Sequence, residues 1–230
     1  MPGLTSMEWE ALRLSLRISF WAVAVSMPFG ILVAWILARL RFPGKSIFDG
    51  IVHLPLVLPP VVTGYVLLVL FGRKGPLGAF LQDHLGVTLA FNWKGAALAA
   101  AVMAFPLLVR AVRLSMESVD QELEAAARTL GAGPLRVFFT VTLPLVAPGI
   151  ISGLILAFAR SLGEFGATIT FVSNIPGETR TLPLALYTLT QMPDGETGAM
   201  RLCLLSVGVA MIAMVLSEMA ARRFSRQLKG

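Results

Sequence analysis

The sequence EAAARTLGAG occupies residues 124–133, and VTLP follows at residues 141–144. Alanine favours helix, and a glycine after a helical run can end it in a left-handed cap. The first stretch therefore predicts a short polar helix in a chain that is otherwise strongly apolar. Small side chains on an exposed helix let the groove of another protein approach the backbone closely. The pattern is typical of a membrane protein that offers a short helix to a soluble partner. An ordinary amphipathic loop helix is the alternative interpretation.

The composition indicates a membrane protein. Of the 230 residues, 56% are hydrophobic and 14% are charged, and the mean hydropathy is +0.79. A soluble domain carries about 25% charged residues. The net charge of +6 could indicate a nucleic-acid partner. However, Lys and Arg stand at the ends of apolar runs, where they set membrane topology, so we expect no nucleic acid to bind.

The apolar runs predict an all-α, polytopic membrane protein that forms a single transmembrane domain over residues 1–230. A membrane-spanning helix needs about 20 apolar residues. Five runs approach that length, the third extending to residue 114 if its arginines reach the membrane surface: 18–38, 51–71, 95–109, 145–172 and 202–217. Residues 182–191 form a further short piece, which we interpret as a partly inserted or external helix. The N-terminus lacks the pattern of a cleaved signal peptide, so the first run should remain as a span.

Basic residues predict the orientation of these spans, because loops on the cytoplasmic side carry more Lys and Arg. With the N-terminus outside, seven basic residues lie outside: Arg13, Arg17, Arg73, Lys74, Lys94, Arg180 and Arg201. Eleven lie inside: Arg39, Arg41, Lys45, Arg110, Arg113, Arg128, Arg136, Arg222, Arg223, Arg226 and Lys229. This bias places both the 124–133 helix and the C-terminal tail in the cytoplasm.

Prolines and glycines mark special positions within the spans. Pro55, Pro59 and Pro60 lie in the second run, where each removes a helix hydrogen bond. They predict either simple curvature or a break beside a path for solute. Gly149 and Gly153 form a GxxxG pair, which we interpret as a helix-packing contact.

Two opposite charges lie inside the fourth run. Arg160 and Glu164 are four residues apart and share one helix face. Charges within the membrane are rare, and they mark a pathway or pair with each other. An arginine could lower the barrier for an oxyanion, whereas an internal ion pair would neutralise both charges. We favour the ion pair, because a bare arginine would bind an oxyanion too tightly to release it readily.

The chain shows little that could perform covalent chemistry. Gly44-Lys45-Ser46 resembles the end of a phosphate-binding loop, but position 39 is an arginine where that loop needs glycine. His53, His84 and the single Cys203 are far apart in sequence, so we expect no metal site and no cofactor. A membrane enzyme would need a catalytic cluster, and we therefore expect a non-catalytic protein.

The stretches at 124–133 and 141–144 resemble the EAA loop of bacterial ABC importer permeases. In that family a Glu-Ala-Ala triplet lies just before a glycine, and Leu-Pro follows about ten residues later. Aligning Gly131 places the triplet on residues 125–127, so that Ala125 stands at the glutamate position and Glu124 lies one residue early. The family's coupling helix docks in a cleft of the ATPase subunit.

Further stretches resemble the molybdate permeases of this family. They are residues 42–45, 53–62, 126–132, 136–140 and 159–167, and together they extend over nearly the whole chain. The SLGEFG sequence at 161–166 is shared with sulfate and tungstate permeases, which are therefore the alternatives for the substrate.

The resemblance implies a MetI-like fold and a molybdate importer in the bacterial inner membrane. The implied partners are a second permease copy, two cytoplasmic ATP-binding subunits and a periplasmic oxyanion-binding protein, with the pathway at the permease interface. The implied coupling segment is about 117–144, and its site residues are Glu124, Ala125, Ala126, Ala127, Arg128, Gly131, Ala132, Gly133 and Pro144. A stand-alone secondary transporter is the alternative of another class, but we find no internal repeat of the kind such proteins often have.

Overall fold

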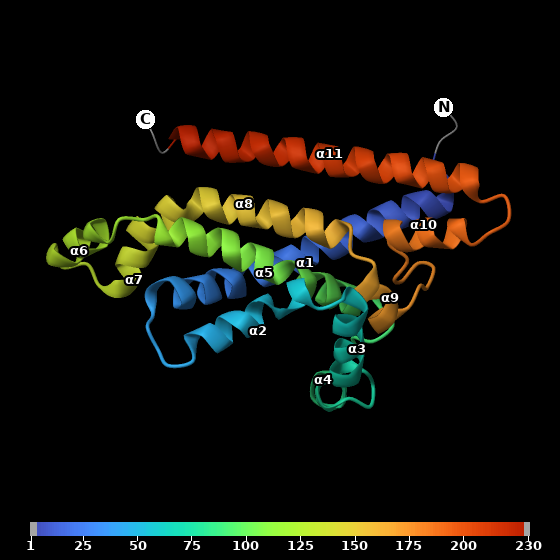
Figure 1. Ribbon diagram of the computed structural model, residues 1–230, viewed down its shortest axis with the longest axis horizontal. Coiled ribbons are helices and arrows are strands. Elements are labelled where there is room, and N and C mark those ends of the chain that lie inside the picture. The colour runs from blue at the N-terminus through green and yellow to red at the C-terminus, as the bar shows by residue number, and fades with distance from the viewer. Residues whose placement is uncertain (1–3, 228–230) are drawn as a thin grey trace.

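The computed structural model describes residues 4–227, and this part of the chain contains helices and no strands. Four long helices run side by side along the molecule (Figure 1): α1 Ser6–Arg39, α5 Trp93–Glu117, α8 Leu143–Leu162 and α11 Glu196–Gln227. Each is long and apolar enough to cross a membrane, and a bent pair of helices gives a fifth candidate span among the described residues. The prediction of an all-α protein with several spans is confirmed.

The core of the bundle is the packing of α5 against α1 and α8. Small residues let these helices approach closely. A Cβ added to Gly30 of α1 would lie 2.7 Å from a Leu108 methyl group, and one added to Gly149 of α8 would lie 2.2 Å from the Ser115 Cβ. The prediction that Gly149 and Gly153 serve helix packing agrees with this geometry, because both face α5.

The second predicted span is broken rather than curved. Helix α2 Lys45–Val57 and helix α3 Pro60–Phe71 meet at an angle of 114°. Leu58 between them is extended, and Pro60 has no N–H to continue the hydrogen-bond pattern. A break was one of the two outcomes that the prolines predicted. As a result, α3 turns away from the bundle and leads to α4 Pro76–Leu85 (Figure 1).

The prediction of one continuous helix over residues 145–172 is wrong. Helix α8 ends at Leu162, and α9 Gly166–Val172 begins after a short break. Apolar residues continue through this region, so hydropathy alone does not reveal the break. Arg160 therefore lies in the last turn of α8, and Glu164 lies in the connection to α9.

The two breaks pack directly against each other. A Cβ added to Gly166 of α9 would lie 2.8 Å from the Pro60 Cβ, and one added to Gly64 of α3 would lie 2.6 Å from the Ala167 carbonyl oxygen. Glycine is needed at both positions because the backbones of α3 and α9 are in close contact. This contact joins the two discontinuous helices into one unit.

The N-terminal end of α1 is joined to α10 Leu182–Thr190 and to α11. Leu182 N–H donates to Ser15 Oγ over 2.7 Å, and Arg201 of α11 pairs with the buried Glu8 over 2.9 Å. Helix α10 is the short piece predicted near residues 182–191. These contacts hold together the end of the bundle opposite the 124–133 helix (Figure 1).

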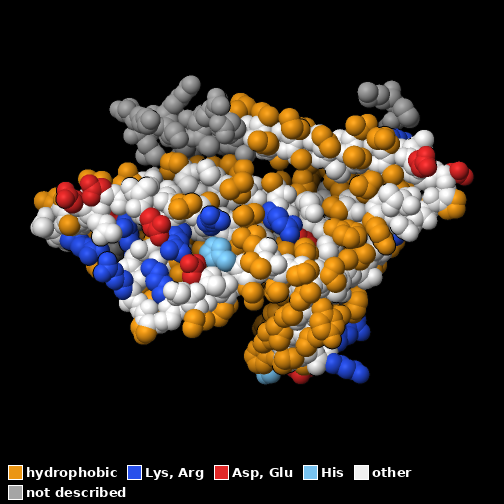
Figure 2. Space-filling view, viewed as in Figure 1, with side chains coloured by type: hydrophobic (Ala, Val, Ile, Leu, Met, Phe, Trp, Pro, Cys, Tyr) orange, Lys and Arg blue, Asp and Glu red, His pale blue; other side chains and the backbone are white. Residues whose placement is uncertain are grey.

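Basic side chains gather near the other end, over α6, α7 and the start of α2 (Figure 2). This end carries Arg39, Arg41, Lys45, Arg128 and Arg136. The arrangement agrees with the predicted orientation, in which this end is cytoplasmic. Of the predicted cytoplasmic basic residues in the tail, Lys229 lies outside the described residues.

We expect Gly64→Ala to destabilise the protein, because the new Cβ would overlap the backbone of Ala167. Overpacking of a close contact costs roughly 1–3 kcal/mol. Gly208→Ala in α11 is the matched control, since nothing lies within 4 Å of a Cβ placed there. The measurement is thermal unfolding of both variants in detergent. Equal midpoints for Gly64→Ala and Gly208→Ala would contradict the close α3–α9 contact.

Candidate functional site

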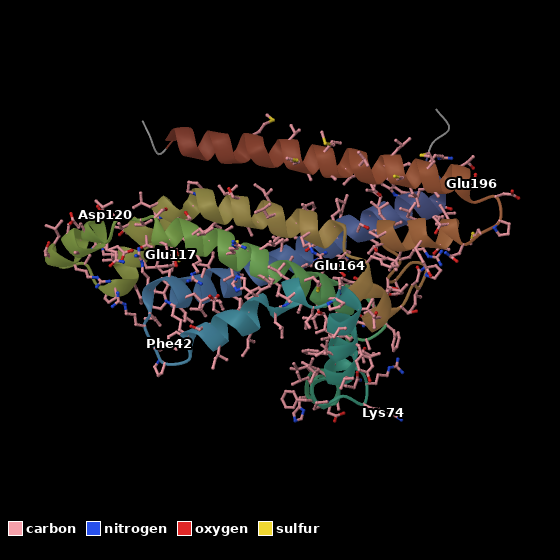
Figure 3. All side chains as sticks on the ribbon, in the orientation of Figure 1. Phe42, Lys74, Glu117, Asp120, Glu164 and Glu196 are labelled. Carbon is pink, nitrogen blue, oxygen red and sulfur yellow. The ribbon has the colours of Figure 1, made fainter. Side chains whose placement is uncertain are left out.

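The predicted coupling segment stands at one end of the bundle, beyond the last turn of α5 (Figure 1). Asp120 caps helix α6 Gln121–Thr129 by accepting from Glu122 N–H over 2.9 Å. Gly131, at φ +86°, ends it in the left-handed conformation expected from the sequence. Figure 3 shows Glu117 and Asp120 on either side of the turn that leads from α5 into this helix.

The segment returns to the bundle without a loop. Helix α7 Pro134–Val137 leads into a π-helical turn, η1 Phe138–Thr142, and η1 leads into α8. Leu143 N–H bonds to the carbonyl oxygen of Phe138, five residues earlier. A movement of α7 would therefore be passed along a continuous helical path into α8.

Most residues predicted to contact a partner are exposed. Ala125, Ala126, Arg128, Gly131 and Gly133 are exposed, as is Pro144, whereas Ala127 and Ala132 are half-buried. A Cβ at either glycine would meet no atom within 4 Å. Large apolar side chains accompany them on the same segment: Leu130 is 89% exposed and Leu135 is 76% exposed. Exposed apolar side chains beside small residues suit a surface that another protein covers.

Glu124 differs from the other predicted coupling residues, because its side chain points into the protein and is buried. Glu124 Oε1 accepts from Arg39 Nη2 over 2.7 Å and from Thr142 Oγ1 over 2.9 Å. Arg39 is the last residue of α1, and Thr142 is the last residue of η1. The carboxylate thus joins α6 to the ends of two bundle helices, and it is not available on the outer face of the segment.

Sequence reasoning did not identify Arg39 and Thr142 as members of this site. The sequence indicates only a topological role for Arg39, which is 85 residues away from Glu124 along the chain. Thr142 lies within the VTLP sequence, but its contact with a carboxylate has no local signal. Beside these residues is a hollow of about 630 Å³, lined in part by Trp35, Gln121 and Arg128.

Arg160 and Glu164 form the ion pair that we favoured from the sequence. The Glu164 side chain is 2% exposed, and its Oε1 also accepts from Ala167 N–H over 2.8 Å. Glu164 therefore replaces a backbone acceptor at the start of α9, a role that the four-residue spacing did not indicate. Figure 3 places Glu164 far from Asp120 and from the exposed coupling segment.

The described residues, 4–227, contain no group of three or more His, Cys, Asp or Glu side chains that could hold a metal ion. What the arrangement offers instead is mechanical: an exposed segment is fixed to α1 and α8 by a buried charged contact and a continuous helix.

Comparison with known proteins agrees with this geometry. The chain is 64% identical to the molybdenum transport system permease protein of Escherichia coli (strain K12), over 99% of each chain. It is 55% identical to the protein of the same description from Haemophilus influenzae, over 96% of this chain and 97% of that one. A sulfate transport system permease protein of Synechococcus elongatus is 36% identical over 95% of this chain and 76% of its own length.

A solved structure shares the fold. A bacterial ABC transporter involved in the import of the acidic polysaccharide alginate superimposes with a TM-score of 0.76 at 17% identity, over 96% of this chain and 80% of that one. The family model described as binding-protein-dependent transport system inner membrane component matches residues 26–226. The chain therefore belongs to the family of inner membrane components of binding-protein-dependent transport systems.

Proposed function

We propose that this chain is the membrane-spanning permease subunit of an ATP-driven ABC importer for molybdate. The observation that carries the proposal is its identity of 64%, over 99% of both chains, with a permease of molybdenum transport. The work of this subunit is conformational, and ATP is hydrolysed by a separate subunit.

The proposed assembly contains two copies of this chain in the bacterial inner membrane, with the anion pathway between them. Two ATP-binding subunits lie on the cytoplasmic side, and an oxyanion-binding protein delivers the anion from the periplasm. The exposed side chains of Leu130 and Leu135 lie at the end of the bundle that carries α6 and α7, and this supports placing the ATPase at that end.

In the proposed coupling mechanism, the ATPase closes on the exposed small residues of α6. The resulting force reaches α1 through the contact between Glu124 and Arg39, and it reaches α8 through Thr142 and the helical path of α7 and η1. Because α1 and α8 both pack against α5, the three helices would move as one body. Movement of this body against its counterpart in the second copy would open the pathway to alternate sides of the membrane.

The decisive experiment reconstitutes the chain in proteoliposomes with ATPase subunits and binding protein. We expect molybdate to stimulate ATP hydrolysis and to accumulate against its gradient. Faster uptake of sulfate or tungstate than of molybdate would identify the chain as a permease for that anion. Uptake without the ATPase would instead indicate a stand-alone secondary transporter.

Gly133→Trp should weaken assembly with the ATPase while leaving the chain folded. Gly133 is exposed at φ −68°, so a bulky residue is tolerated locally but would overlap a closely fitted partner. Overpacking of roughly 1–3 kcal/mol corresponds to about tenfold weaker binding or more. Co-purification from membranes measures binding, and Gly133→Ala is the matched control. Normal ATPase binding and transport by Gly133→Trp would argue that the segment is only a loop.

Glu124→Ala should uncouple the transporter, because it removes the contact of α6 with α1 and η1. Hydrogen bonds to charged groups contribute about 1.5–3 kcal/mol, so we expect molybdate-stimulated ATP hydrolysis to fall about tenfold or more. The exposed face of α6 is unchanged, so the ATPase should still bind. Glu122→Ala removes a neighbouring but exposed acidic side chain and should have little effect. An equal loss of molybdate-stimulated ATP hydrolysis in Glu124→Ala and Glu122→Ala would contradict the idea that the buried contact of Glu124 transmits the force.

Arg160→Ala should destabilise the protein more than the double change Arg160→Ala with Glu164→Gln. The single change leaves a buried carboxylate unpaired, at a cost of about 3–5 kcal/mol. Glutamine in the double variant keeps an oxygen that can accept from Ala167 N–H. Thermal unfolding and molybdate uptake are the measurements. A stable but fully inactive double variant would indicate that Arg160 helps to pass the anion.

A further inference from the structure

A polar groove lies between α2 and α5, in the half of the bundle nearer to α6. Its volume is about 480 Å³, and its polar lining consists of Ser46, Asp49 and His53 from α2 with Arg110, Arg113 and Glu117 from α5. Figure 2 shows a pale-blue histidine with basic and acidic neighbours on this face. None of these residues has a role in the coupling contact around Glu124.

The two arginines and two carboxylates of this groove balance in formal charge, but their ion pairs are distributed unevenly. Arg113 pairs with both carboxylates: its Nη1 lies 2.9 Å from Asp49 Oδ2, and its Nε lies 2.8 Å from Glu117 Oε1. His53 Nδ1 lies 3.0 Å from Asp49 Oδ1, on the other side of the same carboxylate. Arg110, one helical turn before Arg113, has no ion-pair partner among residues 4–227 and is exposed. The groove therefore holds one guanidinium, that of Arg110, with no carboxylate of the described residues in direct contact.

Arg110 lies within the membrane-spanning helix α5 and not at its end. It lies seven residues before the end of α5 at Glu117, about 10 Å along the helix axis. An unpaired charge on a membrane-spanning helix is costly unless it faces a water-filled space or a counter-ion. The groove supplies such a space, since a water molecule takes about 30 Å³ of liquid volume and a small anion with several waters fits within it.

We propose that Arg110, with His53 beside it, forms a weak exit site for a tetrahedral oxyanion on the cytoplasmic half of the pathway. The inference rests on the proposed function, because it assumes that the translocated solute is an oxyanion. The guanidinium offers two parallel N–H donors to two oxygens of the anion. Because His53 Nδ1 contacts Asp49, Nε2 is the ring nitrogen that remains for a hydrogen bond to the anion.

The same groove explains why such a site would release the anion. Asp49 and Glu117 both contact Arg113, so the anion meets one unpaired guanidinium rather than two, in a groove whose arginines and carboxylates sum to zero formal charge. Transport requires a site attractive enough for entry and weak enough for departure. The two carboxylates also lie close enough to repel an anion that lingers near Arg113.

The test measures protection of a thiol at the edge of the groove. Ser46→Cys is introduced together with Cys203→Ser, which removes the natural cysteine. The assembled transporter, with its ATPase subunits, is labelled with a maleimide from the cytoplasmic side. Millimolar sodium molybdate should slow labelling severalfold relative to sodium chloride of equal ionic strength. Sulfate and phosphate, which share the tetrahedral oxygen arrangement, should also slow it.

Adding Arg110→Gln should abolish this protection and lower molybdate uptake about tenfold, the effect of losing one charge-assisted contact. Arg41→Gln is the matched control, because Arg41 is exposed near the same end but does not line the groove. It should keep both protection and uptake. The protection of Ser46→Cys itself is measured with Arg110 in place, so the test does not depend on the folding of Arg110→Gln.

The outcomes separate this inference from the proposed function. Failure of the complete transporter to take up molybdate, with protection by another tetrahedral oxyanion, would refute the substrate and support the site. Normal uptake without protection by any of the three anions would overturn the site and leave the function intact. Protection that needs anionic lipid and no added anion would assign Arg110 to a lipid headgroup and would also overturn the site.

Discussion

A backbone inside a bilayer must satisfy its hydrogen bonds within the protein, and the rest of this structure follows from that constraint. Long stretches of the chain meet it with unbroken helices. Where the chain departs from helix, at residues 58–59 and 163–165, the helices that follow the two breaks, α3 and α9, pack closely against each other. At the second break a carboxylate oxygen of Glu164 accepts the N–H of Ala167 and takes the place of a missing carbonyl. Arg160 then compensates the charge of that carboxylate.

Glu124 in α6 and Glu164 in the connection from α8 to α9 are buried glutamates that act in the same way at two places in the bundle. Glu164 stabilises a break within the bundle, and Glu124 fixes the exposed segment to the bundle. Each is buried, and each pairs with one arginine while also accepting from a neutral donor. A carboxylate can accept several hydrogen bonds at once, so one side chain can hold two or three elements in a fixed relation. The parts that would have to move together are therefore joined by charged contacts rather than by apolar packing alone.

Features that depend on local sequence could be predicted well. Runs of apolar residues located the spans, the glycine at 131 located the end of α6, and consecutive prolines marked the bend between α2 and α3. Features that depend on distant residues could not. Hydropathy does not reveal the end of α8, because Phe, Ala, Ile and Val continue the apolar run past it, and the backbone contact of Glu164 has no periodic signature. The inward direction of Glu124 depends on Arg39, and the groove beside Arg110 depends on residues of α2 that are about 60 positions earlier in the chain.

The π-helical turn at Phe138–Thr142 has a consequence for how this chain tolerates insertions and deletions. In an α-helix, removing one residue rotates everything that follows by about 100°, which would turn the buried face of α8 away from α5. A π-helical turn already holds one residue more than the α-helical path requires. Loss of a residue here, such as the exposed Thr140, would convert the turn to α-helix and leave the register on both sides unchanged. Sequence length is therefore free to vary by one residue at this joint, while a deletion within α8 itself would disrupt the bundle.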